Sequence, residues 1–390
     1  MTYYLILTLS IVVLLHSSLA ARLSINVQRL GAKADGKTDV SKVFLRAWNS
    51  ACASRNPAQI YVPRGKYLIR APIVFSGQNC KHSMFLRIEG TIVASTDYNL
   101  IGKHGNWIKF ERVNGLSLFG GTIDAKGAAL WNCKKSGRNC PTGATSIGFY
   151  SSTNVVVSRL TSINSQMFHM IVYKCRGVNL RGIKILALGR SPNTDGINVQ
   201  FSSGVSILNS RISTGDDCVS IGPGTTNTWI ENVFCGPGHG ISIGSLGRDL
   251  QEPGVQNLTV KSVAFRNTDN GVRIKTWARS SNGFVRNVLF KNIVMSNVKN
   301  PILIDQDYCP NNQNCPGKVS GVKISNVRYQ NIRGSSATPV AVQFQCSKKY
   351  PCSGIRLQDV ALTYKNQAAK ASCAYAGGTA SGVMKPSSCL

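Results

Sequence analysis

From about residue 86 onward, the chain repeats a short pattern of apolar and polar positions. Two apolar residues, two positions apart, are followed by two spacer residues and a second such pair. Copies of the pattern, some of them weak, begin at Val155, Val178, Val205, Thr228, Leu258, Val288, Val322 and Ile355. Alternation with a period of two predicts strands that each bury one face, and the spacer predicts a bend into the next strand.

Glycine and asparagine gather at these expected bends, where left-handed backbone conformations are needed. The residues concerned are Gly177, Gly182, Asn209, Asn232, Asn287, Asn292 and Asn326. Repeats of this size that carry short strands are typical of a stacked β-solenoid, whereas propeller blades recur near 40 residues with signatures that this chain lacks. We therefore predict an all-β fold, a single-stranded right-handed parallel β-helix.

The two ends of the solenoid require separate treatment. Residues 40–51 place apolar side chains at helical spacing, and Thr38 or Asp39 can cap the helix that they predict. A solenoid needs its open end covered, so we expect this helix to form the N-terminal cap. After Lys365 the repeat fades, and we expect a tail held by a disulfide between Cys373 and Cys389.

Residues 1–20 have the composition of a secretory signal peptide. They contain no charged residue, and the apolar run from Leu5 to Leu15 is followed by small residues ending at Ala20. This run is too short for a confident membrane span. We predict a signal peptide at 1–20, a catalytic β-helix domain at 21–390, and a secreted protein that does not associate with membranes.

The charge balance indicates a polyanionic partner. Lys and Arg number 45 against 16 Asp and Glu, which gives a net charge of +29. The basic residues are scattered and no groove-reading motif is present, so we do not expect nucleic-acid binding. An acidic polysaccharide outside the cell fits the signal peptide better; the alternative is that the charge only maintains solubility.

Thirteen cysteines in a secreted chain predict a disulfide framework with one thiol left over. Closeness in the sequence suggests the partners, and Cys175 remains unpaired. The expected pairs are Cys52 with Cys80, Cys133 with Cys140, Cys218 with Cys235, Cys309 with Cys315, Cys346 with Cys352, and Cys373 with Cys389. Because none of these pairs has CxxC spacing, we expect no metal site among them.

Three polar heads in the middle of the chain can be superimposed. Asp195, Asp217 and His239 lie 22 residues apart, and each is followed by an alternating apolar pair. Adjacent coils would stack these residues in one column, roughly 4.8 Å apart. Asp216 adds a third carboxyl group, and crowded carboxyl groups shift one another's pKa values, as acid–base chemistry requires.

The same alignment extends to the following coils. Residues 270–275 match residues 239–244 position for position, so Arg273 and Lys275 lie on the outward face, and Tyr308 follows on the next coil. Taken singly, these residues have simpler explanations: turn formation for Asp195, solvation or calcium binding for Asp216 and Asp217. Independent turn residues would not be expected to share one register.

These motifs resemble those of the polygalacturonases, pectin-hydrolysing glycoside hydrolases, and most closely their plant members. The resemblance rests on Asn193-Thr194-Asp195, Gly215-Asp216-Asp217, Gly238-His239-Gly240 and Arg273-Ile274-Lys275, and covers nearly the whole chain after the signal peptide. It implies that Asp216 is the general acid, that Asp195 and Asp217 activate water, and that His239 supports the protonation of the acid. It also implies that Arg273, Lys275 and Tyr308 bind the substrate.

The resemblance implies a secreted enzyme that hydrolyses de-esterified homogalacturonan with inversion, without a cofactor or metal. The context from Gly271 to Trp277 resembles endo-acting plant members, so we expect endo attack by a monomer. Two alternatives remain at this stage. One is a calcium-dependent pectate lyase with the three aspartates as ligands; the other is a pectin-binding wall protein with a vestigial site.

Overall fold

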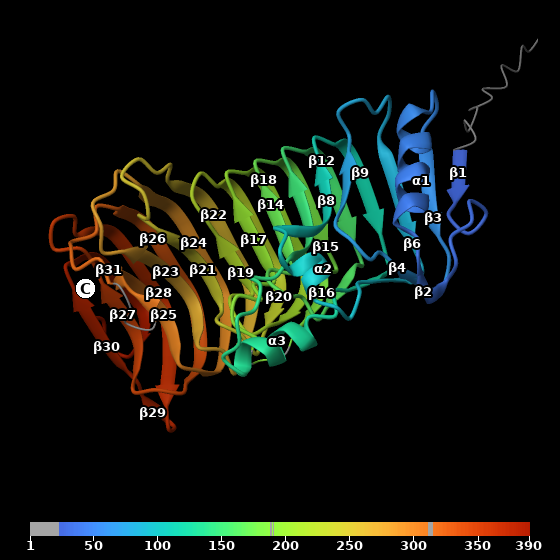
Figure 1. Cartoon of the computed structure of the whole chain (residues 1–390). Coiled ribbons are helices and arrows are strands. Elements are labelled where there is room, and N and C mark those ends of the chain that lie inside the picture. Colours follow the sequence, from blue (N-terminus) through green and yellow to red (C-terminus); the bar gives the residue numbers. More distant parts are fainter. Residues whose placement is uncertain (1–22, 188, 190, 311–314) are drawn as a thin grey trace, which may run out of the picture.

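The chain forms a right-handed parallel β-helix, as predicted. The computed structural model describes residues 23–187, 189, 191–310 and 315–390. Figure 1 shows the strands stacked along one long axis in chain order, from β1 and α1 at one end to β30 and β31 at the other. Sequence neighbours therefore lie in adjacent coils, and the functional residues are arranged along this axis.

One wall of the solenoid is an eleven-stranded sheet in which neighbouring strands are parallel. It receives one strand from each coil. Its strands are β5 (Ile73–Ser76), β8 (Asn106–Glu111), β11 (Thr145–Tyr150), β14 (Met170–Tyr173), β17 (Ile197–Gln200), β19 (Val219–Ile221), β21 (Ile241–Leu246), β23 (Asn270–Trp277), β25 (Asn300–Tyr308), β27 (Val340–Gln345) and β30 (Lys370–Ala374).

The remaining wall is a twenty-stranded sheet that bends along its length. Its strands are β1 (Leu23–Asn26), β2 (Asp35–Asp39), β3 (Ala58–Val62), β4 (Lys66–Leu68), β6 (Met84–Ile88), β7 (Thr91–Val93), β9 (Asn114–Phe119), β10 (Thr122–Asp124), β12 (Thr153–Ser158), β13 (Thr161–Ile163), β15 (Arg176–Arg181), β16 (Lys184–Leu186), β18 (Ser203–Ser213), β20 (Thr226–Cys235), β22 (Val255–Arg266), β24 (Phe284–Val298), β26 (Lys323–Ser336), β28 (Cys352–Tyr364), β29 (Gln367–Ala368) and β31 (Ala376–Lys385).

The two apolar pairs of each repeat account for this bend. In the early coils they form two short strands, such as β15 and β16, and from β18 onward they form one long bent strand. The residue at the bend has a positive φ, for example 50° at Asn209 and 55° at Asn232. The Asn232 side chain donates a hydrogen bond to the Asn209 carbonyl oxygen at 3.1 Å. Asparagine therefore tolerates the conformation and also links adjacent coils.

All seven glycines and asparagines expected at bends have a positive φ, which confirms that prediction. The apolar positions line the interior; Val178, Leu180, Ile183 and Ile185, for example, are at most 1% exposed. Rings also stack from coil to coil, since Phe110 lies 5.5 Å from Phe149 between centroids. The hydrophobic core is therefore a set of columns parallel to the axis.

The predicted alignment of one coil was wrong. Val288 pairs with Val327, and not with Val322 as the repeat suggested. Val322 is itself buried and stands two residues from Ile324, which is also buried. Because both apolar pairs have the same spacing, periodicity alone could not distinguish them.

Helix α1 (Ser41–Ala53) lies beside the first coils and buries the predicted face through Phe44, Ala47, Trp48 and Ala51. Its N-cap is Val40, one or two residues beyond the predicted positions, and the cap makes no side-chain hydrogen bond. The carboxylate of Asp39 nevertheless accepts a hydrogen bond from the backbone N–H of Ser41 at 3.0 Å. The helix was therefore correctly predicted, but its cap was not.

Three other elements were not predicted. Helices α2 (Asn99–Gly102) and α3 (Ala128–Lys135) precede β8 and β11. The segment after Lys365 is a further coil and not an irregular tail, since β30 pairs with β27 and β31 with β28. Strand β31 is rich in Gly, Ala and Ser, so it lacks the apolar pairs that mark a repeat, and backbone pairing holds it in place.

The cysteine pairing follows the prediction in full. Six disulfides join the six expected pairs, and Cys175 is free and buried. The predicted signal peptide at 1–20 lies outside the described residues. Among the helices that the structure describes, none has the length and apolar character needed to cross a membrane.

We expect loss of the Cys218–Cys235 bond to destabilise the protein. The bond spans 17 residues and joins the start of β19 to the end of β20 across the interior. Closing a loop of that size contributes about 3 kcal/mol in the chain-entropy model. The double substitution Cys218→Ala with Cys235→Ala should therefore lower the free energy of unfolding by about this amount in urea denaturation. An unchanged unfolding midpoint would contradict the expectation.

Candidate active site

The polar heads singled out in the sequence lie at one edge of the eleven-stranded sheet. Backbone pairing matches Ile197 with Val219, and Val219 with Ile241. Asp195, Asp217 and His239 each lie two residues before these positions, so the predicted column is confirmed at the level of register. The strands start at this edge, and the turns that precede them hold the acidic side chains above the sheet.

Asp195 is a buried carboxyl group with few polar partners. It is 7% exposed and accepts a hydrogen bond from the Ser220 hydroxyl at 2.6 Å. Burial raises the pKa of Asp195 to about 8, with further contributions from the charges of Asp216 and Asp217. Asp195 is therefore protonated in the free protein at neutral and acidic pH.

Asp216 forms a pair with His239. The imidazole Nδ1 lies 3.0 Å from Asp216 Oδ1, and the backbone N–H of Asn193 donates to Asp216 Oδ2 at 2.9 Å. Burial on its own would raise the pKa of Asp216, but the hydrogen bond and charge of His239 outweigh it and hold that pKa well below its ordinary value. The hydrogen bond to Asp216 in turn raises the pKa of His239.

This proton distribution differs from the one that the sequence suggested for the free protein. If Asp216 is the general acid, it must be protonated when it acts, yet in the free protein the protons reside on Asp195 and His239. The reason is local: Asp216 has an imidazole as its direct partner, and Asp195 has only a hydroxyl. Sequence spacing placed the three carboxyl groups together but did not show which one contacts His239.

Asp217 contacts both predicted substrate-binding cations. Arg273 Nη2 lies 2.9 Å from Asp217 Oδ1 and Lys275 Nζ lies 2.8 Å from Asp217 Oδ2. The Ser242 hydroxyl also donates to Oδ1 at 2.8 Å. Arg273 and Lys275 are 9% and 7% exposed. Before any ligand binds, these cations therefore neutralise a buried carboxylate, a role that the sequence did not reveal.

Tyr308 lies next to the two cations, as predicted. Its ring centroid is 5.2 Å from Lys275 Nζ and 5.9 Å from the guanidinium carbon of Arg273. The ring also contacts Trp277 edge-on, with 5.4 Å between centroids. An aromatic face beside two cations offers a surface for a sugar ring whose carboxylate points toward the positive charge.

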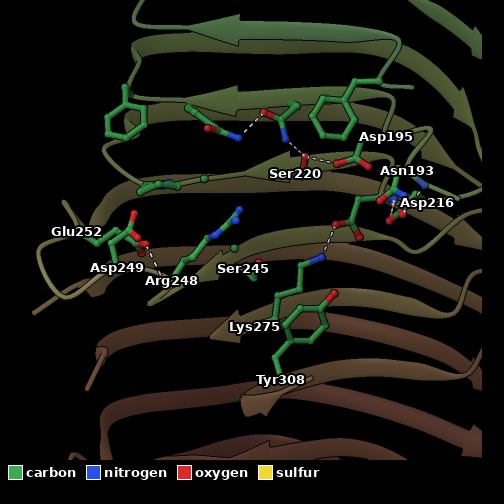
Figure 2. A pocket seen from close by; sticks show the side chains of 18 residues that line it. Asn193, Asp195, Asp216, Ser220, Ser245, Arg248, Asp249, Glu252, Lys275 and Tyr308 are labelled. Atoms are coloured by element: carbon green, nitrogen blue, oxygen red, sulfur yellow. Dashed lines mark hydrogen bonds and ion pairs between the residues drawn. The ribbon is translucent and has the colours of Figure 1, made fainter. Parts of the chain in front are cut away.

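These residues line a pocket of about 510 Å³ on the outer face of the eleven-stranded sheet. Figure 2 shows Asp195 and Asp216 at one end, and Arg248, Asp249 and Glu252 at the other. This volume lies within the usual range for small-molecule sites. The pocket therefore extends across the width of the sheet, beyond the acidic cluster.

The segment at the far end was not found from the sequence. Glu252 is 8% exposed, and its carboxylate accepts hydrogen bonds from the backbone N–H groups of Gly247 and Arg248, the latter at 3.1 Å. It thus holds the turn that carries Arg248. The turn follows β21 and has no counterpart in the other repeats, so periodicity gave no signal. A charged run directly after a matched motif was the available indication.

The donor set does not suit a calcium ion. Ligand atoms of Asp216, Asp217 and His239 lie within 4.8 Å of one another. However, Arg273 and Lys275 contact the two oxygens of Asp217, and Asp216 is paired with His239. Calcium requires six to eight oxygen ligands and does not favour imidazole nitrogen. The arrangement is instead suited to proton transfer and to the binding of an anion.

Comparisons with known proteins agree with this assessment. Residues 52–383 match the model of "Glycosyl hydrolases family 28". The chain is 58% identical over 385 residues to a polygalacturonase of Prunus persica, with 98% of each chain covered. It is 42% identical over 373 residues to an exopolygalacturonase of Arabidopsis thaliana, covering 94% of this chain and 83% of the relative.

Solved structures show the same fold. An endo-xylogalacturonan hydrolase from Aspergillus tubingensis superimposes with a TM-score of 0.77 at 21% identity. The match covers 92% of this chain and 99% of that one. At this level of identity the likeness establishes the β-helix architecture.

We expect Asp195→Asn to stabilise the folded protein at pH 7. The pKa of Asp195 in the folded state, about 8, lies above the ordinary value of 3.8, so folding takes up a proton between these limits. The carboxyl group therefore destabilises the folded state increasingly as pH rises from about 4 to 8, and an amide avoids this cost. The gain at pH 7 should be about 1–4 kcal/mol, and it should vanish near pH 4.

Urea unfolding at pH 4 and pH 7 measures this difference. Asp217→Asn is the matched control, because it leaves Arg273 and Lys275 without their carboxylate and should destabilise the protein instead. Equal destabilisation by both substitutions at pH 7 would contradict the protonation state assigned to Asp195.

Proposed function

Because the chain belongs to glycosyl hydrolase family 28, we propose that this glycosidase hydrolyses the α-1,4 linkages of de-esterified homogalacturonan. The observation that carries the proposal is the joint arrangement of three carboxyl groups, one imidazole and two cations in a single pocket. The carboxyl groups and the imidazole supply acid–base catalysis, and the cations supply recognition of an acidic sugar. The lyase is not proposed, since the family is one of hydrolases and the donor set does not suit calcium.

Asp216 is the general acid in this scheme, and His239 supplies its proton. The hydrogen bond of 3.0 Å between them provides the path for the Nδ1 proton to reach the carboxylate. Asp216 then donates that proton to the glycosidic oxygen as the bond to the leaving sugar breaks. His239 thus supports protonation of the acid, and the pair needs one proton between its two members to be active.

Asp195 and Asp217 hold the attacking water. Asp217, whose negative charge is stabilised by Arg273 and Lys275, accepts the proton that the water loses as its oxygen bonds to the anomeric carbon. Asp195 completes the water site by hydrogen bonding. Since water attacks in one step from the face opposite the leaving group, the anomeric centre inverts and no aspartate becomes glycosylated.

Lys275 and Tyr308 bind the galacturonate residue, with Arg273 adding positive charge. An ammonium group can donate three hydrogen bonds, and in the free protein Asp217 accepts one from Lys275. Lys275 therefore retains donors for the sugar carboxylate without leaving Asp217. Arg273 is more fully committed, since it also donates to the Ser242 hydroxyl at 3.0 Å.

The proposal includes endo attack by a secreted monomer that needs no cofactor. Endo action is supported by the context from Gly271 to Trp277, whereas one of the relatives above is named an exopolygalacturonase. The six disulfides support an oxidising, extracellular location, with residues 1–20 as the signal peptide. The net charge of +29 favours an acidic wall polymer and disfavours self-association.

We expect Asp216→Asn to abolish hydrolysis while the polymer still binds. The amide keeps the shape of the side chain but cannot deliver a proton, and general acid catalysis contributes about 10²- to 10⁴-fold. The release of reducing ends from polygalacturonate measures the loss, and sedimentation with the insoluble polymer measures binding. Retention of more than about a tenth of the activity would defeat the assignment.

Product analysis tests the reaction itself. Proton NMR of the first product formed from polygalacturonate should show the inverted anomer, and oligomers of middle length should appear before monomer. Hydrolysis should continue in the presence of a chelator without forming an unsaturated, ultraviolet-absorbing product. A retained anomer would refute single displacement, and monomer alone would replace endo with exo action. No product at all would favour the vestigial wall protein.

A further inference from the structure

Four charged residues of alternating sign lie in consecutive turns along the edge of the eleven-stranded sheet. They are Asp216 before β19, His239 before β21, Asp269 before β23 and Lys299 before β25. His239 Nε2 lies 3.4 Å from Asp269 Oδ2, and Lys299 Nζ lies 2.6 Å from Asp269 Oδ1. The row therefore begins at the general acid and ends at an exposed lysine outside the residues that line the pocket.

Backbone contacts fix Asp269 relative to His239. Gly238 forms a parallel bridge with Thr268, and the N–H of Asp269 donates to the Gly238 carbonyl oxygen at 2.9 Å. The Asn270 side chain donates to the carbonyl oxygen of His239 at 3.1 Å. These bonds hold the two turns together, so the carboxylate beside Nε2 belongs to the architecture of the coil.

We propose that Asp269 is a positioning residue that acts on Asp216 through His239. This proposal rests on the proposed function, because it concerns the acid of the same reaction. Asp269 accepts the Nε2 proton and leaves Nδ1 directed at Asp216, so the imidazole is held between two carboxylates in its doubly protonated form. Lys299 limits this effect by neutralising part of the charge on Asp269.

The charges that surround His239 support this arrangement. The hydrogen bond and charge of Asp216, and the charges of Asp217 and Asp269, raise the pKa of His239 against the opposing effect of burial. Of these groups, Asp216 and Asp217 are needed for the chemistry. Asp269 is the one whose carboxylate can be changed without altering a group assigned to bind substrate or water.

The primary experiment is an NMR titration of His239 in Asp269→Asn. Removal of one partly exposed charge should lower the pKa of His239 by about 0.5 unit. The alkaline limb of the kcat/KM profile on oligogalacturonate should move to lower pH by the same amount, because the Asp216–His239 pair then loses its proton earlier. The chain has five histidines, and the His239 signal is assigned by its absence in His239→Gln.

Lys299→Gln should act in the opposite direction. Without the lysine, Asp269 exerts its full charge, so the pKa of His239 and the alkaline limb should rise by a few tenths of a unit. In the Asp269→Asn background the same lysine substitution should have no effect, since its partner is gone. Opposite signs cannot result from a general loss of stability.

Glu231→Gln is the matched control, because Glu231 forms a 3.0 Å ion pair with Lys261 on the other sheet. It should leave the His239 titration unchanged. The proposal is overturned if Asp269→Asn leaves the pKa of His239 unchanged, or if Asp269→Asn and Lys299→Gln shift it in the same direction. The titration needs no substrate, so its outcome is independent of whether the chain hydrolyses homogalacturonan.

Discussion

The parallel hydrogen-bond register between coils is the constraint on which the other features of this protein depend. It places each residue beside one particular residue of the next coil, at the strand spacing of about 4.8 Å. Val155, Val178 and Val205 thus form one column inside, and Asn227, Asn257 and Asn287 form a hydrogen-bonded column outside. A residue type that suits one coil therefore suits its neighbours, provided that stacking like on like is favourable.

Stacking is unfavourable for like charges, and the site resolves this conflict in three different ways. Asp217 contacts cations that β23 supplies from two coils further on. Asp216 pairs with the imidazole of the next coil. Asp195 has no such partner and keeps a proton, which is the lower-energy alternative to an isolated buried charge. The same crowding that costs stability thus gives three identical side chains three different protonation behaviours.

The corners of the coils give the fold its freedom to vary. Residues can be added between strands without disturbing the register, which is why the coils differ in length. Helices α2 and α3 enter at the edge that also holds the acidic cluster, and the turn with Arg248 and Glu252 enters at the opposite edge. The ends of the pocket are consequently formed by segments that do not repeat, while its floor is formed by segments that do.

The sequence by itself determined the features that depend on periodicity. The period-two alternation gave the β-helix, and the spacing of 22 residues gave the column of Asp195, Asp217 and His239. The close spacing of cysteines gave all six disulfides. These features are accessible because a parallel coil converts distance along the chain into position along one axis.

Only the tertiary structure decided which side chain contacts which. It paired Val327 with Val288, directed His239 toward Asp216, joined Arg273 and Lys275 to Asp217, and placed Asp269 behind the imidazole. Register fixes where a backbone position lies, but side-chain contacts within a crowded column depend on the competing energies of burial, charge and hydrogen bonding. These energies are set by all of the neighbouring coils together, so no repeat considered alone contains them.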